Sequence, residues 1–111
     1  MTKRLLTVLA LTLLSGAACA DMKPDAPTVL ITGANRGIGL EIARQYAAKN
    51  WNVIATSRRP ADDPGLAELR AIAAKHPQVA IERIDVVDTK MIRGVAEKYR
   101  NLPIDVLVNN A

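Results

Sequence analysis

Short apolar runs alternate with longer segments of helical periodicity along most of this chain. The runs are continuous in apolar residues, which is typical of strands buried on both faces of a parallel sheet. They cover residues 28–32, 52–56, 79–84 and 104–108. The helical segments have apolar residues three and four positions apart and cover residues 38–50, 66–75 and 89–102. This alternation predicts an α/β fold: a Rossmann-type parallel sheet with flanking helices, strand order 3-2-1-4, truncated after the fourth strand.

The apolar side of each helical segment predicts the face that packs on the sheet. In the first segment this side carries Ile38, Ile42, Ala43, Tyr46 and Ala47. In the second it carries Leu66, Leu69, Ile72 and Ala73, and in the third Ile92, Val95, Ala96 and Tyr99. Asp88 precedes the third segment, where its carboxylate can accept hydrogen bonds from the free N–H groups of a helix start.

The first twenty residues differ in kind from the rest. Lys3 and Arg4 precede an uncharged run of Leu, Val, Ala and Thr at residues 5–14, and small residues then lead to Ala18-Cys19-Ala20. A charged start, a short apolar run and an A-x-A site make up a secretory signal peptide, and this run is too short to span a bilayer. We therefore predict a signal peptide at residues 1–20, an extended leader at residues 21–27, and the amino-terminal part of one domain at residues 28–111.

Two alternatives to cleavage after Ala20 stay open. Cys19 follows small residues as in a bacterial lipoprotein, although Gly16 stands where that pattern usually carries Leu. Translation that starts at Met22 would instead give a cytoplasmic protein. Random upstream codons seldom produce charge, apolar run and cleavage site in this order, so a periplasmic or secreted protein is favoured.

Charge and aromatic content argue against a nucleic-acid partner. From Asp21 onward the chain has thirteen basic and eleven acidic residues, because Lys3 and Arg4 are two of the fifteen basic ones. The chain has three aromatic residues, and they are not interleaved with basic ones as in nucleic-acid-binding surfaces. Cys19 is the single cysteine, so no internal disulfide can form.

The segment Thr32-Gly33-Ala34-Asn35-Arg36-Gly37-Ile38-Gly39 leads from the first predicted strand into the first helix. A helix start offers unpaired N–H groups and a partial positive charge to a pyrophosphate. Gly33 permits a tight turn, Gly37 lets the backbone approach the ligand, and Gly39 lets the helix pack near the strand. No Gly-Lys-Ser/Thr closes the segment, which excludes a P-loop. The sequence thus predicts a dinucleotide-binding turn formed by Gly33, Asn35, Arg36, Gly37, Ile38 and Gly39.

At this turn the chain resembles the short-chain dehydrogenase/reductase family. The resemblance rests also on Asp85-Val86-Val87-Asp88 and on Asn109-Asn110-Ala111, which follow in family order at family-like separations. It implies hydride transfer between a nicotinamide cofactor and a small carbonyl or alcohol substrate, by a protein that is a homo-oligomer when complete. It implies further that Asp85 hydrogen-bonds the adenine amino group, that Val86 lines the adenine, and that Asn109 lies beside the nicotinamide ribose. Asn110 is expected to tie neighbouring strand ends together.

The residues after the second strand favour NADP over NAD. NAD-binding sheets commonly carry a carboxylate there for the ribose hydroxyls, whereas this chain has Ser57-Arg58-Arg59 and no acid before Asp62. A guanidinium is a forked, permanently charged donor for the 2′-phosphate of NADP. Arg36 is expected to project toward the same pocket, and Ser57 can add a hydroxyl contact. We therefore expect NADP (NADPH) as the cofactor, bound in part by Arg36, Ser57 and Arg58.

No catalytic residue is predicted within these 111 residues. The family pairs a Tyr with a Lys four residues later, which lowers the pKa of the Tyr that protonates the developing alkoxide. Tyr46 is followed at this spacing by Asn50, and Tyr99 by Pro103. We therefore expect the cofactor-binding, amino-terminal half of a longer NADPH-dependent reductase. The alternative is a nucleotide-binding fragment or cofactor sensor without chemistry.

Overall fold

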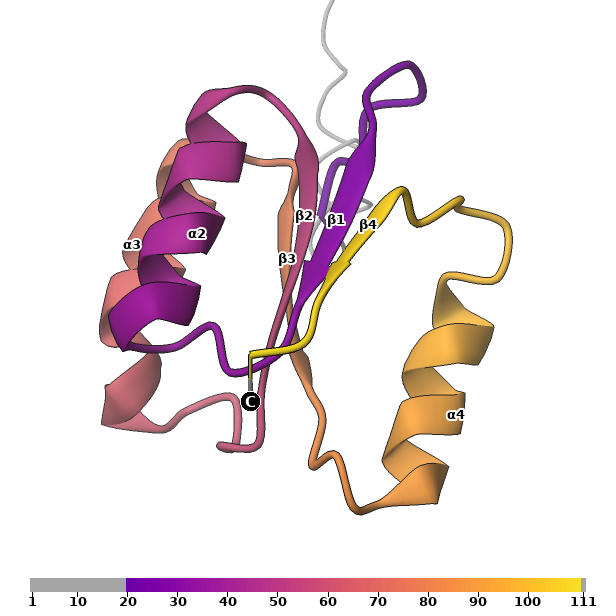
Figure 1. The fold of residues 1–111 in the computed structure, drawn as a ribbon. Coiled ribbons are helices and arrows are strands. Elements are labelled where there is room, and N and C mark those ends of the chain that lie inside the picture. Colours follow the sequence, from indigo (N-terminus) through magenta and orange to yellow (C-terminus); the bar gives the residue numbers. More distant parts are fainter. Residues whose placement is uncertain (1–19, 111) are drawn as a thin grey trace, which may run out of the picture.

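A four-stranded parallel sheet with the strand order β3-β2-β1-β4 organises the chain, as predicted (Figure 1). The computed structural model describes residues 20–110, so the predicted signal peptide, Cys19 included, lies outside the described residues apart from Ala20. The strands are β1 (Thr28–Ile31), β2 (Asn52–Ser57), β3 (Val79–Arg83) and β4 (Val106–Val108). The helices are α2 (Gly37–Ala48), α3 (Ala67–Lys75) and α4 (Thr89–Lys98), with a short 3-10 helix, η2 (Pro64–Leu66), before α3.

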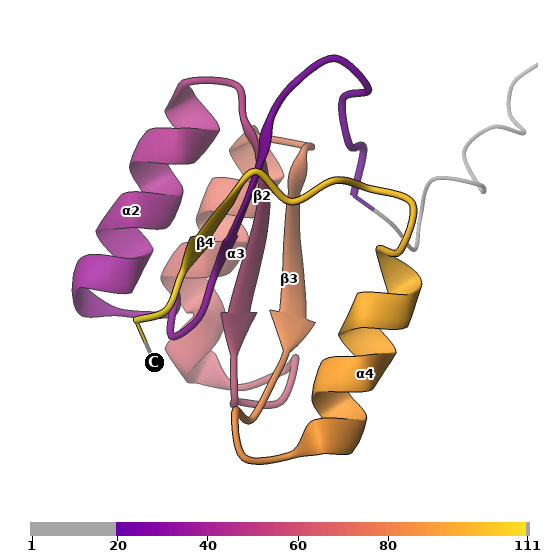
Figure 2. The same cartoon turned by 45° about the vertical axis from the view of Figure 1, so that its right-hand side comes forward.

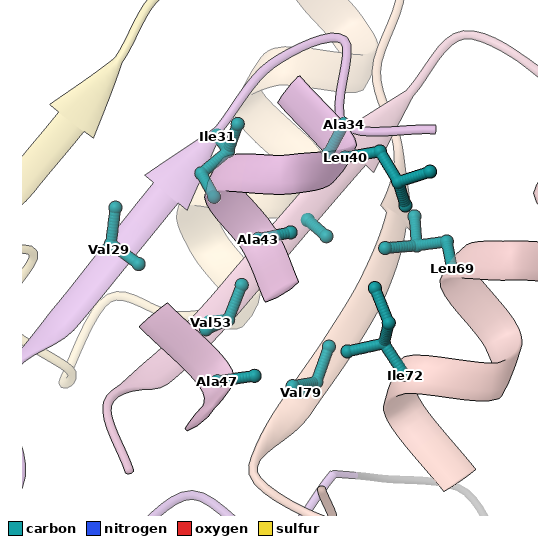
Figure 3. Packing of buried hydrophobic residues seen from close by; sticks show 11 residues of the cluster. Val29, Ile31, Ala34, Leu40, Ala43, Ala47, Val53, Leu69, Ile72 and Val79 are labelled. Atoms are coloured by element: carbon teal, nitrogen blue, oxygen red, sulfur yellow. The ribbon is translucent and has the colours of Figure 1, made fainter. Parts of the chain in front are cut away.

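Helices α2 and α3 cover one face of the sheet, and α4 lies on the other (Figure 1). The segment after α4 runs along the amino-terminal edge of the sheet to reach β4 (Figure 2). β2 is buried along its whole length, as a continuous apolar run between two layers requires. The core between the sheet and α2 and α3 is formed by Val29, Ile31, Ala34, Leu40, Ala43, Ala47, Val53, Ala55, Leu69, Ile72 and Val79 (Figure 3). Within residues 20–110, the helices are too short or too polar to cross a membrane.

Small residues of α2 face the sheet, which corrects the predicted packing face. Ala43 and Ala47 are buried as expected, together with Gly39 and Leu40, whereas Ile38 is 73% exposed. The prediction was wrong for Ile38, because large apolar residues are usually the buried ones and here small residues take that place. The start of α2 lies so close to the glycine-rich turn that its smallest residues must point inward, and Ile38 then points outward.

Helix α4 begins as predicted but packs less fully than its apolar residues suggest. Asp88 accepts hydrogen bonds from the backbone N–H groups of Lys90 and Met91 (3.0 and 3.2 Å). Val95 is buried, but Ile92 and Ala96, which were predicted to pack on the sheet, are exposed. They line an apolar groove of about 370 Å³ between α4 and the β1–β4 side of the sheet. The prediction was wrong for these two residues because α4 stands away from the sheet beside this groove.

At its end, α4 is anchored to β3 by polar contacts. Tyr99 donates a hydrogen bond to the carboxylate of Glu82 (2.5 Å), and the ammonium group of Lys98 lies 2.7 Å from the same carboxylate. These contacts join the carboxyl end of the helix to the edge strand of the sheet.

The leader at residues 21–27 is hydrogen-bonded to the sheet, although the sequence predicted an extended segment. It turns at Pro24 and Asp25, and Asp21 donates its backbone N–H to the carbonyl of Pro77 (2.8 Å). The buried side chain of Asn52 accepts from the backbone N–H of Lys23 (2.6 Å) and donates to the carbonyl of the same residue (2.9 Å). Backbone groups that lie against a buried strand need such partners, so the leader is part of the domain.

Candidate dinucleotide site

The glycine-rich turn joins the carboxyl end of β1 to the start of α2. Gly33 and Gly37 have left-handed backbone angles, φ +63° and +58°, which a side chain makes unfavourable. Between them, the buried Ala34 donates its backbone N–H to the carbonyl of Thr56 in β2 (2.9 Å). The turn is therefore fixed to two neighbouring strands at the carboxyl edge of the sheet.

Gly39 allows α2 to start directly against this turn. A methyl group on Gly39 would lie 2.1 Å from the carbonyl oxygen of Gly33 and 2.7 Å from the side-chain nitrogen of Asn110. Asn110 holds the turn from β4: its Nδ2 donates to the Gly33 carbonyl (3.1 Å), and its backbone N–H donates to Oγ1 of Thr32 (2.9 Å). Asn110 thus ties neighbouring strand ends together, as predicted.

The helix start beside the turn carries no counter-charge of its own. Arg36 precedes α2 with an extended backbone and makes no side-chain cap, and the first turn of α2 has no acidic residue. The partial positive charge of a helix start is strongest within this first turn. An anion at this place would meet free N–H groups and no competing carboxylate from α2.

A cavity of about 690 Å³ opens at the carboxyl ends of β1, β2 and β3. Its wall joins the glycine-rich turn, the residues after β2, the residues after β3, and one residue after β4. The lining residues are Thr32, Gly33, Asn35, Arg36, Gly37, Ser57, Arg58, Arg59, Ile84, Asp85, Val86, Val87 and Asn110. Open α/β sheets bind their ligands at this edge, and the volume lies within the usual range for small-molecule and cofactor pockets.

Arginine side chains give the cavity a cationic side. The guanidinium of Arg59 lies 3.4 Å from the carboxylate of Asp63, which also accepts a hydrogen bond from the backbone N–H of Gly65 (2.7 Å). Within residues 20–110, the side chains of Arg36 and Arg58 make no hydrogen bond or ion pair. Two guanidinium groups in the wall are therefore available to an anion, while the third is partly neutralised.

The segment after β3 forms the opposite, less polar part of the wall. Asp85 is half-buried, and its carboxylate accepts a hydrogen bond from the backbone N–H of Val87 (3.2 Å). Its carbonyl accepts from the N–H of Asp88 (2.8 Å). These bonds fix a tight bend that leaves Val86 and Val87 half or more exposed. An apolar edge beside a carboxylate suits a planar base with an amino group.

Most predicted site residues meet in this cavity, and three lie outside its lining. Ile38 points outward, Gly39 lies behind the turn, and Asn109 stands beside Thr32, whose Oγ1 is 3.4 Å from the Asn109 side-chain oxygen. Asn110 also lines the cavity, although it was predicted only to tie strand ends together. Its position directly after β4, the neighbour of β1, is the signal that could have placed it there. The other lining residues not predicted are Thr32, Arg59, Ile84 and Val87.

Comparisons with known proteins agree with this geometry. A family model described as short chain dehydrogenase matches residues 27–111. The chain belongs to the short-chain dehydrogenase family. The chain is 33% identical over 100 residues to retinol dehydrogenase 12 of Homo sapiens. The matched region covers 87% of this chain and 32% of the retinol dehydrogenase.

Solved structures share its Rossmann-like sheet. Menthone neomenthol reductase from Mentha piperita matches with a TM-score of 0.68 and 29% identity, over 78% of this chain and 32% of that one. A short-chain dehydrogenase/reductase from Burkholderia multivorans with bound NADP matches with a TM-score of 0.67 and 31% identity, over 78% of this chain and 36% of that one. The dehydrogenase chain thus spans about a third of the length of these relatives.

Proposed function

We propose that this chain supplies the cofactor-binding part of an NADPH-dependent oxidoreductase that transfers hydride between the cofactor and a small carbonyl or alcohol substrate. The observation that carries the proposal is the cavity at the carboxyl edge of the sheet. It combines a glycine-rich turn at an uncapped helix start with Arg36 and Arg58, whose side chains have no partner among residues 20–110. Membership in the short-chain dehydrogenase family supports the reaction class.

The turn suits the pyrophosphate of a dinucleotide. Gly33 and Gly37 line the cavity without side chains, so an anion can reach the backbone there. The free N–H groups and the dipole at the start of α2 favour a negative charge at that position. Asp85 and Val86, across the cavity, are then expected to contact the adenine, and Asn109 at the end of β4 to lie near the nicotinamide ribose.

The arginines support NADP rather than NAD. The 2′-phosphate of NADP adds about two negative charges next to the adenine, and arginine binds a phosphate through forked, charge-assisted hydrogen bonds. Arg36 and Arg58 line the same cavity from the turn and from the end of β2. Ser57, buried at the end of β2, can add its hydroxyl. A relative from Burkholderia multivorans was solved with NADP bound.

The catalytic residues belong, in this proposal, to the remaining two thirds of the protein. The relatives are about three times as long as this chain, and no Tyr-x-x-x-Lys occurs within its 111 residues. The substrate then binds against the nicotinamide near the end of β4. We propose that the complete protein is a homo-oligomer.

Equilibrium titration of the full-length protein with NADPH and NADH tests the proposal. Replacing both Arg36 and Arg58 by Ala is expected to weaken NADPH binding at least tenfold, because two charged hydrogen-bond donors are lost, and to leave NADH binding nearly unchanged. Arg93→Ala is the matched control, since Arg93 is an exposed arginine of α4 outside the cavity. Equal losses of NADPH and NADH binding in the double variant would refute the NADP assignment. If the wild type bound neither cofactor, the proposed function would be wrong.

We further propose export of the protein by its first twenty residues. The supporting observation is the order of charge, apolar run and Ala18-Cys19-Ala20 in the sequence. Mass spectrometry of the mature protein should find Asp21 at the amino terminus. A cytosolic protein that begins at Met22 would overturn the proposal, and a lipid on Cys19 would replace it by a lipoprotein.

A further inference from the structure

Arg83 is the last residue of β3 and does not line the cavity. Its guanidinium Nε donates a hydrogen bond to the backbone carbonyl of Arg58 (3.0 Å). We infer that Arg83 is a positioning residue for cofactor specificity: it holds the backbone of Arg58 so that the Arg58 side chain meets the 2′-phosphate of NADP. The inference rests on the proposed function and assigns a role to a residue outside the site.

The hydrogen bond from Arg83 continues the pairing of β2 and β3 beyond the point where the strands separate. Ser57 and Arg83 are the last paired residues of these strands, and Ile84 donates its backbone N–H to the carbonyl of Ser57 (2.9 Å). After Ser57 the β2 chain bends, so no backbone N–H of β3 reaches the next carbonyl, that of Arg58. The Arg83 side chain supplies the missing donor.

Both ends of the peptide group that follows Arg58 are held. Its carbonyl oxygen, that of Arg58, accepts from Arg83, and its N–H, that of Arg59, donates to Oγ of Ser57 (3.2 Å). A peptide group is planar, so fixing its two ends fixes its plane. This plane is one of the two that meet at the Cα of Arg58, so holding it restrains the direction in which the Arg58 side chain leaves the backbone. Arg58 itself is exposed, and its side chain has no partner in the part of the chain that the structure describes.

The arrangement also distinguishes the two arginines after β2. Asp63 draws the guanidinium of Arg59 to itself, while the Arg58 guanidinium has no partner within the described part of the chain. The backbone of the free arginine is the one that Arg83 holds. Loosening it should therefore weaken a contact that NADPH makes through its 2′-phosphate and that NADH lacks.

Three substitutions of Arg83 separate this hydrogen bond from the charge of the side chain. Arg83→Gln places an amide N–H at the same number of bonds from Cβ as Nε, so it keeps the donor and removes the charge. Arg83→Lys keeps the charge but places a methylene at that point. Arg83→Met removes both. Arg83 is exposed, so these variants are expected to fold, and their urea unfolding midpoints check that they do.

The experiment titrates NADPH and NADH into the full-length wild type and the three variants. Loss of one orienting hydrogen bond is expected to weaken NADPH binding about fivefold in Arg83→Met and Arg83→Lys, with NADH binding unchanged. Arg83→Gln keeps the hydrogen bond, so it is expected to bind NADPH as tightly as the wild type does. The reverse pattern, with Lys retained and Gln lost, would show that Arg83 acts through its charge and would overturn the positioning role. NADPH binding unchanged in all three would also overturn it. A wild type that does not prefer NADPH would instead refute the proposed function itself.

Discussion

Substituting Gly39 by Ala tests how closely the first helix must approach the phosphate-binding turn. The added methyl carbon would lie 2.1 Å from the carbonyl oxygen of Gly33, whereas ordinary contact begins near 3.4 Å. The obstacle is backbone, which cannot swing aside as a flexible side chain can. The turn and the helix must therefore separate by about 1 Å, and the hydrogen bond from Asn110 to the Gly33 carbonyl is disturbed with them.

The cost of this change is estimated from two contributions. Overpacking of a tightly packed site costs about 1–3 kcal/mol, and loss of one hydrogen bond adds about 1 kcal/mol. We expect Gly39→Ala to lower the free energy of unfolding by about 3 kcal/mol, a large part of the roughly 5–15 kcal/mol available to a domain. Binding of NADPH and of NADH should weaken together, because the turn serves the pyrophosphate that both cofactors contain.

Two other glycines of the chain are matched controls. Gly37 has a positive φ but open space around it, so Gly37→Ala should cost only the left-handed backbone, about 1–2 kcal/mol. Gly94 lies within α4, also in open space, so Gly94→Ala should stabilise the protein by about 0.5–1 kcal/mol. Urea unfolding followed by circular dichroism, with cofactor titration, measures all three variants. If Gly39→Ala is no less stable than Gly37→Ala, the close approach of α2 to the carbonyl of Gly33 is wrong.

Three further changes probe other parts of the molecule. Asn110→Ala should weaken NADPH and NADH binding equally, about fivefold, since it frees the glycine-rich turn from β4; a change for one cofactor alone would contradict this role. Asn52→Ala should lower the free energy of unfolding by about 2 kcal/mol, because the buried Asn52 side chain loses its two hydrogen bonds to the Lys23 backbone, and an unchanged urea midpoint would show that the leader is not part of the domain. Hydrogen bonds from Gln45 and Arg44 lower the pKa of Glu41 below its ordinary value of 4.5, so this carboxylate stabilises the fold above that pH and loses its effect as the pH falls through the lowered pKa. The stability difference between wild type and Glu41→Gln, measured by urea unfolding from pH 7 to pH 3, should therefore shrink on acidification; a difference that grows would contradict the sign.

The fold followed from the sequence wherever burial depends on apolar runs alone. Residues 52–56 lie between two helical layers and the partner strands, so their continuous apolar pattern had one interpretation, and the strand is found at Asn52–Ser57. The buried face of α2 was harder to predict. Beside the glycine-rich turn the small residues of the helix face the sheet, and Ile38 is exposed to solvent. The partial exposure of Ile92 in α4 depends on the distance of a helix from its sheet, which periodicity does not encode.

The site was predictable as far as its chemistry lies in contiguous motifs. Gly33 and Gly37 were placed correctly because a turn between strand and helix demands them. The distinction between Arg58 and Arg59 was not accessible, because it depends on Asp63 folding back in a later turn. The contact of Arg83 with the Arg58 carbonyl likewise joins residues that only the parallel pairing of β2 and β3 brings together.

A crystal structure of the full-length protein with NADP bound tests the proposed cofactor site most directly. The pyrophosphate is expected over Gly33 and Gly37 at the start of α2, the adenine beside Asp85 and Val86, and the 2′-phosphate between Arg36 and Arg58. A dinucleotide bound elsewhere, or a 2′-phosphate that points away from both arginines into solvent, would contradict it.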